Sequence, residues 1–208
     1  MSCKNATLPV MLALITCMVS VHWQMSAARA QEPAKPSSPP EHSTAPIEVV
    51  EPADYKMTDY RSPVPKTLSG ARVVDAKGAE SLLASGKAIL IDVYPRAPKP
   101  AGLPANTIWR SPKHTSIKGS FWLPNVGYGR LAAEPEAYFK SNLERLSGGA
   151  KDATVFFFCL RDCWMSWNAA KRALSWGYTS IVWFPDGTDG WQEIGKETVN
   201  VEPEAGGG

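Results

Sequence analysis

Short apolar runs alternate with amphipathic segments between residues 71 and 201. The run 153–159 is apolar at every position except Thr154, as is typical of a strand buried on both faces of a parallel sheet. The strand candidates are 71–76, 87–95, 117–125, 153–159 and 180–185, and the helix candidates are 77–86, 134–149 and 166–178. This alternation predicts a single α/β domain with a largely parallel central sheet flanked by helices.

The remaining segments have low apolar content or many prolines. Residues 31–52 are rich in proline and predict a flexible tether. Residues 53–70 predict a transitional segment, in which tyrosines dock on the domain while prolines prevent regular structure. We further expect a proline-rich loop at 95–112, a loop with a short helix at 186–195, and a disordered tail at 202–208.

The first thirty residues have the pattern of an export signal. Lys4 supplies a positive charge, residues 8–21 form an apolar stretch, and residues 28–30 form a small-x-small cleavage site. The apolar stretch is short for a membrane span, so we expect a signal peptide at 1–30, a periplasmic location and no permanent membrane span. Loss of Lys4 and Arg29 turns 22 basic and 20 acidic residues into 20 and 20. A nearly neutral chain of this kind is not expected to bind nucleic acid.

Cleavage would also leave Cys159 and Cys163 as the only cysteines of the mature chain. They lie where the strand 153–159 ends and the helix 166–178 is about to begin. In an oxidising compartment, such a pair is joined, kept reduced for a task, bound to a metal, or buried without a role. A helix amino terminus favours an anion, so this position can lower the pKa of a thiol or hold a persulfide or an oxyanion.

The spacing of the two cysteines bears on their redox state. Successive turns of a finished helix would hold their Cα atoms about 6 Å apart with the side chains splayed, whereas a compact loop can bring the sulfurs within bonding distance. A ring this small recovers little chain entropy, so the bond should stabilise the fold weakly and be easily reduced. We predict a reducible Cys159–Cys163 disulfide, with Cys159 the more acidic thiol after reduction.

Residues 71–196 resemble a single rhodanese-type domain. The segment "AILIDVYP" is similar to the strand with that family's Asp-Val signature, "IKGSFWLPN" to its His-Ile-Pro-Gly-Ala-like segment, and "VFFFC" to its catalytic strand. More narrowly, "CLRDCWMSWNAAKRA" with "DGTDGW" is similar to a small exported rhodanese-like group known by a Cys-Cys-Trp motif. That group is associated with catabolism that depends on pyrroloquinoline quinone (PQQ).

The resemblance implies that Cys159 is the sulfur-accepting nucleophile and that the loop after it wraps backbone N–H groups around the sulfur or an oxyanion. The loop residues would be Leu160, Arg161, Asp162, Trp164 and Met165. Ordinary members close this loop on an arginine, and here Trp164 or Met165 occupies that position. Arg161 is the one substitute in the loop, and Asp162 beside it opposes the charge.

Two further residues are candidates for an auxiliary role. Asp92 matches the strand-end aspartate of the family, but Tyr94 replaces the arginine expected two residues later, so we interpret Asp92 as structural. His114, the sole histidine of the predicted domain, is a candidate base or a zinc ligand together with the cysteines. Two cysteines and one histidine leave zinc without a fourth ligand, so we expect no metal and no cofactor.

Two functions remain open from the sequence. In the first, Cys159 attacks sulfur and Cys163 resolves the persulfide or closes a disulfide, with a small sulfur donor or thiol as partner. In the second, the chain is a non-catalytic accessory that docks onto a periplasmic quinoprotein dehydrogenase or its cytochrome, in a PQQ-dependent alcohol dehydrogenase system. The missing loop arginine and the tether favour the second.

Overall fold

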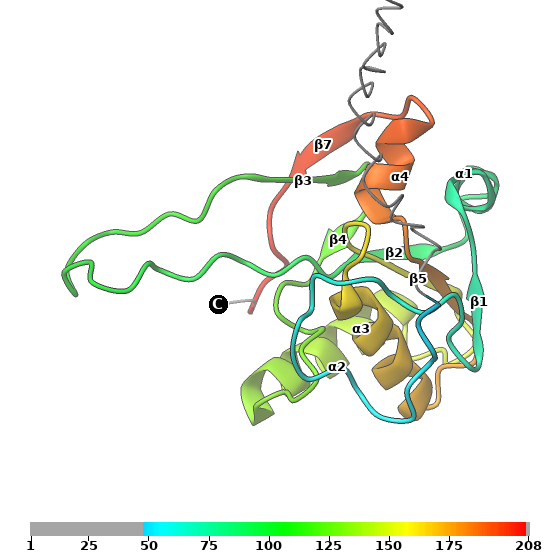
Figure 1. The fold of residues 1–208 in the computed structure, drawn as a ribbon, viewed down its shortest axis with the longest axis horizontal. Coiled ribbons are helices and arrows are strands. Elements are labelled where there is room, and N and C mark those ends of the chain that lie inside the picture. The colour runs from blue at the N-terminus through cyan, green and yellow to red at the C-terminus, as the bar shows by residue number, and fades with distance from the viewer. Residues whose placement is uncertain (1–47, 207–208) are drawn as a thin grey trace, which may run out of the picture. The chain divides into compact units, whose positions relative to one another are not determined.

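Five parallel strands form the central sheet of the computed structural model, which describes residues 48–206 (Figure 1). The strand order is β1-β6-β5-β2-β4, and every neighbouring pair is parallel. The strands are β1 Ala71–Val73, β2 Ile89–Asp92, β4 Phe121–Trp122, β5 Val155–Phe158 and β6 Ile181–Phe184. The prediction of an α/β domain with a largely parallel sheet is confirmed.

The described residues belong to the unit Thr44–Gly208. The predicted signal peptide, residues 31–47 of the predicted tether and residues 207–208 of the predicted tail lie outside the described residues. None of the helices in residues 48–206 combines the length and the apolar character that a membrane span needs.

Alternate residues of the central strand β5 pack against different helices. Val155 and Phe157 join the core under α2 (Ala133–Ser147) and α3 (Trp164–Ser175), whereas Phe156 and Phe158 join a second core with residues of α1 (Ala76–Ala84) and with Trp191. All four β5 residues are fully buried, as expected for a strand with covered faces. The sheet is therefore flanked by helices, as predicted.

Local sequence signals account for the helix ends. The Asp75 side chain accepts a hydrogen bond from the Gly78 amide and caps the start of α1. Glu134 and Glu136 lie in the first turn of α2, and Gly148 ends it with a left-handed backbone. The helix α3 begins at Trp164, two residues earlier than predicted, and α4 (Gly187–Glu193) occupies the segment expected to hold a short helix.

One predicted strand was wrong and another was missed. The segment 117–125 is not a single strand: β3 (His114–Ile117) ends before a turn at Gly119, and β4 follows in the main sheet. β3 instead pairs antiparallel with β7 (Thr198–Val201), which the sequence pattern did not indicate. Both strands of this ribbon contain polar, partly exposed residues, so neither has the apolar run of a central strand.

Residues 53–70 contain no helix and only a single-residue bridge, and they lie along α3 (Figure 1). We call residues 55–64 the strap. The side-chain amide of Asn168 on α3 holds the strap through two hydrogen bonds, both at 2.9 Å. Its Oδ1 accepts from the Lys56 backbone N–H, and its Nδ2 donates to the Lys56 carbonyl. The strap thus uses backbone hydrogen bonds to a helix side chain instead of joining a sheet.

Arg172 on α3 holds the β4–α2 connection against the core. It is 6% exposed, and its guanidinium donates to the carbonyls of Val126, Tyr128 and Gly129 at 2.8–3.3 Å and stacks on the Tyr55 ring. Burial lowers its pKa from the ordinary value. No carboxylate of residues 48–206 forms an ion pair with it, so backbone carbonyls and a ring hold this charge.

We expect Arg172→Met to lower the free energy of unfolding by about 3 kcal/mol, because it leaves buried carbonyls without donors. Urea unfolding followed by circular dichroism measures this change. Arg145→Met is the matched control, since Arg145 is 53% exposed in its ion pair with Glu204, and it should cost no more than about 1 kcal/mol. Equal losses for the two variants would contradict a structural role of the buried guanidinium.

Candidate functional site

A disulfide bond joins Cys159 and Cys163 at the carboxyl end of the central strand β5. Their Cα atoms are 6.2 Å apart, and Cys163 is the N-cap residue of α3. The loop 160–162 between strand and helix lets the two side chains meet. The predicted bond is therefore present, and its easy reduction stays a prediction.

Both cysteines are buried, with 1% and 2% of their surface exposed. The strap covers them: Arg61 pairs with Cys163 in an isolated antiparallel bridge, and the Tyr60 carbonyl accepts a hydrogen bond from the Trp164 amide at 2.9 Å. The Trp164 side chain also fastens the strap, because its Nε1 donates to the Ser62 hydroxyl and the Pro63 carbonyl. A reagent from solvent therefore has no direct path to either sulfur in this conformation.

The charge of Arg161 is already compensated within the protein. Its guanidinium donates to both carboxylate oxygens of Glu193, at 2.5 and 2.6 Å, and lies 3.4 Å from Asp186. The hydrogen bonds to Glu193 raise the pKa of Arg161 and lower that of Glu193. The sequence named Asp162 as the opposing charge, but Asp162 is exposed, and the carboxylates that meet Arg161 come from α4 and its N-cap.

One loop amide is also occupied by a carboxylate. The Arg161 backbone N–H donates to Asp189 Oδ2 at 2.9 Å, so it does not point to an open anion site. The α4 segment approaches closely here, since the Thr188 amide donates to the Cys159 carbonyl at 2.9 Å. Two amides expected to hold sulfur or an oxyanion, those of Arg161 and Trp164, thus bind protein oxygens instead.

Trp164 and Met165 lie elsewhere than the sequence suggested. They are not loop residues but the first two residues of α3, and they are 2% and 1% exposed. Trp164 packs edge-on against Trp167. Met165 packs so closely on Gly127 that a Cβ added to Gly127 would overlap the Met165 backbone. Leu160 is the predicted loop residue that lines a cavity.

A second cluster forms around Asp92, which is fully buried at the end of β2. Its carboxylate accepts hydrogen bonds from His114 Nε2 at 2.7 Å, the Ser116 hydroxyl at 2.5 Å and the Tyr94 amide at 2.8 Å. Sequence reasoning named Asp92 and His114 separately but missed their contact and Ser116. The available signal was the alternation along β3, which puts residues 114 and 116 on one face.

The His114 ring is enclosed by aromatic side chains. It stacks on Tyr94 with ring centroids 4.8 Å apart, and its centroid lies 4.6 Å from that of Trp122. Within residues 48–206, no three His, Cys, Asp or Glu side chains are grouped so that they could hold a metal ion. The arrangement is that of a carboxylate-oriented imidazole.

A cavity of about 470 Å³ lies between this cluster and the cysteine loop, and we call it the histidine cavity. His114 and Trp122 line one part, and Leu160, Thr188 and Asp189 line the part next to Cys159. Its other lining residues are Tyr94, Pro95, Arg96, Ala97, Pro98, Pro112, Lys113, Thr115, Tyr128, Gln192 and Thr198.

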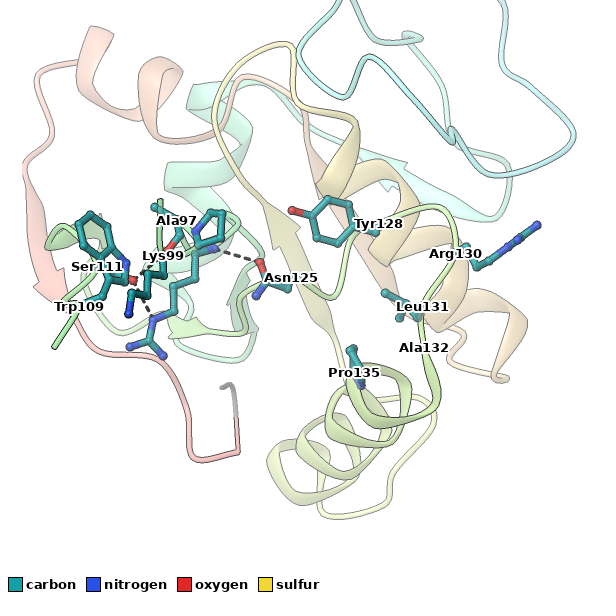
Figure 2. Close-up of a pocket in the computed structure, with 12 residues that line it drawn as sticks. Ala97, Lys99, Trp109, Ser111, Asn125, Tyr128, Arg130, Leu131, Ala132 and Pro135 are labelled. Atoms are coloured by element: carbon teal, nitrogen blue, oxygen red, sulfur yellow. Dashed lines mark hydrogen bonds between the residues drawn. The ribbon is translucent and has the colours of Figure 1, made fainter. Parts of the chain in front are cut away.

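A neighbouring cavity, also of about 470 Å³, lies at the base of the β2–β3 connection, residues 93–113, which we call the arm. The arm extends far from the sheet in Figure 1. Figure 2 shows Trp109 and Lys99 of the arm on one side of the cavity, with Tyr128 facing it and Arg130 pointing away. The Lys99 amine is engaged by three carbonyls of the arm itself. The two cavities share Arg96, Ala97, Pro98 and Tyr128.

The histidine cavity lies between segments of opposite charge. Residues 93–133 contain six Lys or Arg residues and no Asp or Glu, a local asymmetry that the near-neutral total conceals. On the other side, α4 and its N-cap supply Asp186, Asp189 and Glu193. The arm side of the cavity is therefore the side that attracts an anion.

No protein-family model matches the chain, and no curated protein matches it. Among solved structures it is similar to a thiosulfate sulfurtransferase from Pseudomonas aeruginosa (15% identity, TM-score 0.43), covering 64% of this chain and 21% of that one. A rhodanese-like domain from Anabaena (16%, TM-score 0.40) covers 64% and 81%. A polysulfide-sulfur transferase homodimer from Wolinella succinogenes (18%, TM-score 0.40) covers 66% and 84%. The chain thus spans about a fifth of the first of these proteins.

Proposed function

We propose that the chain is an exported, periplasmic rhodanese-like protein that handles sulfane sulfur at Cys159 and Cys163. The observation that carries the proposal is the disulfide at the carboxyl end of the central parallel strand, next to the start of α3. Open parallel sheets bind ligands beyond this edge. A helix start also favours the thiolate form of a cysteine after reduction.

The pair supports a complete sulfur reaction without a further oxidant. The Cys159 thiolate attacks the outer sulfur of a persulfide donor, forms a Cys159 persulfide and releases the donor as a thiol. The Cys163 thiolate then attacks the Cys159 sulfur, closes the disulfide and expels hydrosulfide. Two equivalents of a small thiol restore both cysteines and leave as a disulfide. The sulfane sulfur is reduced to sulfide, and the small thiol is oxidised.

The charges near the loop favour an organic persulfide over thiosulfate as donor. Thiosulfate is a dianion, and Arg161, the one basic residue of loop 160–162, is already paired with Glu193 and Asp186. Asp189 adds a further carboxylate at this loop. A donor that brings its sulfur on a small organic group does not require a cationic grip of this kind.

We expect the reduced Cys163→Ser variant to gain one sulfur atom from a persulfide donor and to keep it on Cys159. Wild type should instead form the disulfide and release sulfide, and Cys159→Ser should lose sulfide release by about 10²-fold or more. Intact-protein mass spectrometry and a sulfide assay read the two outcomes. If Cys159→Ser gains sulfur and releases sulfide like wild type, the proposal fails.

A second candidate is the non-catalytic accessory of a PQQ-dependent alcohol dehydrogenase system. The burial of both sulfurs favours it, because a bond at 1% and 2% exposure is also what a structural disulfide shows. The association with this dehydrogenase system comes from the sequence resemblance alone. An accessory should retain a quinoprotein dehydrogenase or its cytochrome in a pull-down from the periplasm even when both cysteines are replaced with serine, whereas a catalyst should lose all sulfide release.

A further inference from the structure

The orientation of His114 is fixed from three sides, with one nitrogen left for a ligand. Its side chain is only 10% exposed, its Nε2 bonds Asp92, and its ring contacts the rings of both Tyr94 and Trp122. Asp92 also accepts from Ser116 and the Tyr94 amide, so Nε2 is the nitrogen that donates to it in a neutral imidazole. Nδ1 is then an acceptor, and no described side chain or backbone group bonds it.

The surroundings of this nitrogen indicate the class of ligand. His114 lines the histidine cavity, and a neutral imidazole can take a proton from a ligand that reaches its Nδ1. Lys113 on the arm side attracts a carboxylate. Aromatic and proline side chains form much of the remaining wall. A small molecule with an acidic X–H group and a carboxylate matches these features.

The position of the cavity indicates what the X–H group is. Leu160 and Thr188 line it, Leu160 directly follows Cys159, and the Thr188 amide bonds the Cys159 carbonyl. A bound ligand therefore lies next to the loop that carries the disulfide. The reaction proposed above requires a thiol to restore this disulfide, and a thiol reacts as the thiolate, which a base must generate near neutral pH.

We propose that the histidine cavity binds the small carboxylate-bearing thiol that reduces the Cys159–Cys163 disulfide, with His114 Nδ1 accepting the thiol proton and Asp92 holding the imidazole. The inference rests on the proposed function and names the reductant of that same site. His114 acts as the base, and Asp92 positions it.

The reaction balances with the groups named. The thiol gives its proton to His114, and the thiolate attacks one sulfur of the disulfide. A mixed disulfide forms, and the other cysteine leaves as a thiolate that takes the proton from the imidazolium. A second thiol releases the oxidised disulfide product and leaves two reduced cysteines. Because neither sulfur lines the cavity, Leu160 and the loop after it must move before the attack.

Binding is tested first, with an unreactive probe and no sulfur donor. We expect 3-(methylthio)propionate to bind the oxidised protein and to shift the His114 ring signals in NMR titrations, with the neutral 3-(methylthio)propanol binding at least about tenfold more weakly. Lys113→Gln, a change at an exposed residue, should weaken the binding of the carboxylate probe and leave the binding of the neutral probe unaffected. Equal binding of both probes, or no shift of His114, overturns the assignment of the cavity.

Reduction of the disulfide tests the base. We expect His114→Gln to slow reduction by 3-mercaptopropionate at neutral pH by about 10²-fold. A phosphine has no proton to lose, so its rate of reduction of the variant should stay within twofold of its rate with wild type. This control would reveal any change in access or folding. Equal slowing of both reductants, or of neither, overturns the role of His114. These rates need no persulfide, so retention of sulfur transfer by Cys159→Ser, which would overturn the proposed function, and failure of this inference are separate results.

Discussion

Replacing Trp164 with alanine is expected to speed reduction of the Cys159–Cys163 disulfide by about 100-fold. The indole is 2% exposed, and its Nε1 makes two hydrogen bonds to the strap, to Ser62 and Pro63. Removing a buried aromatic costs about 3–5 kcal/mol, and the loss falls on the contact that holds the strap over the cysteines. About 3 kcal/mol lost from the closed state corresponds to roughly a hundredfold rise in the open population.

The rate is measured by alkylating free thiols at intervals after a mild reductant is added, under conditions where circular dichroism shows the variant folded. Trp109→Ala is the matched control, because Trp109 is 37% exposed on the arm and belongs to neither the strap nor the cysteine loop. It should leave the rate unchanged. If Trp164→Ala is reduced as slowly as wild type, the strap does not control access to the disulfide.

Gly187→Ala is expected to lower the free energy of unfolding by more than about 3 kcal/mol. Gly187 has a left-handed backbone with φ of 52°, and a Cβ there would overlap the Cys159 carbonyl. The residue also pairs with Leu160, so the α4 segment and the cysteine loop must separate to make room. Both the backbone conformation and the contact therefore oppose a side chain.

Gly195→Ala separates these two effects. Gly195 also has a positive φ, of 78°, but a Cβ there would meet nothing within 4 Å. Its alanine variant should cost only about 1 kcal/mol, the conformational part of the effect. Urea unfolding of the two variants measures the difference, and equal losses would mean that the close approach at Cys159 contributes nothing.

The strands buried on both faces were predictable because their sequences are unambiguous. Residues 155–158 are apolar without interruption, and the structure buries every one of them. The β3–β7 ribbon was not predictable in the same way, since its half-exposed strands show no apolar run. The short strand β4 was merged with the residues before it because Gly119, which turns the chain between the two strands, looks like any glycine within a strand.

The cysteine pair and its bond followed from the sequence, but its surroundings did not. The carboxylates that engage Arg161 belong to a segment, 186–193, which reads as a glycine-rich turn with a short helix. The cover over the sulfurs comes from a proline-bearing stretch with no periodicity of its own. Contacts of this kind depend on tertiary packing between distant segments, so a local sequence pattern cannot predict them.

Because of the strap, the part of the chain that forms the strands and helices begins later than the part that shields the disulfide. A chain shortened to begin at residue 71 would retain every strand and helix, yet it would lose the oxygen atoms that bond Trp164 and Trp167. A single proteolytic cut within residues 53–70 would likewise uncover the Cys159–Cys163 disulfide, about a hundred positions downstream. Ser62 and Trp164, which are hydrogen-bonded, are 102 positions apart. Proteolytic trimming of an otherwise intact fold would thus act as a chemical switch, turning a shielded disulfide into a reactive one.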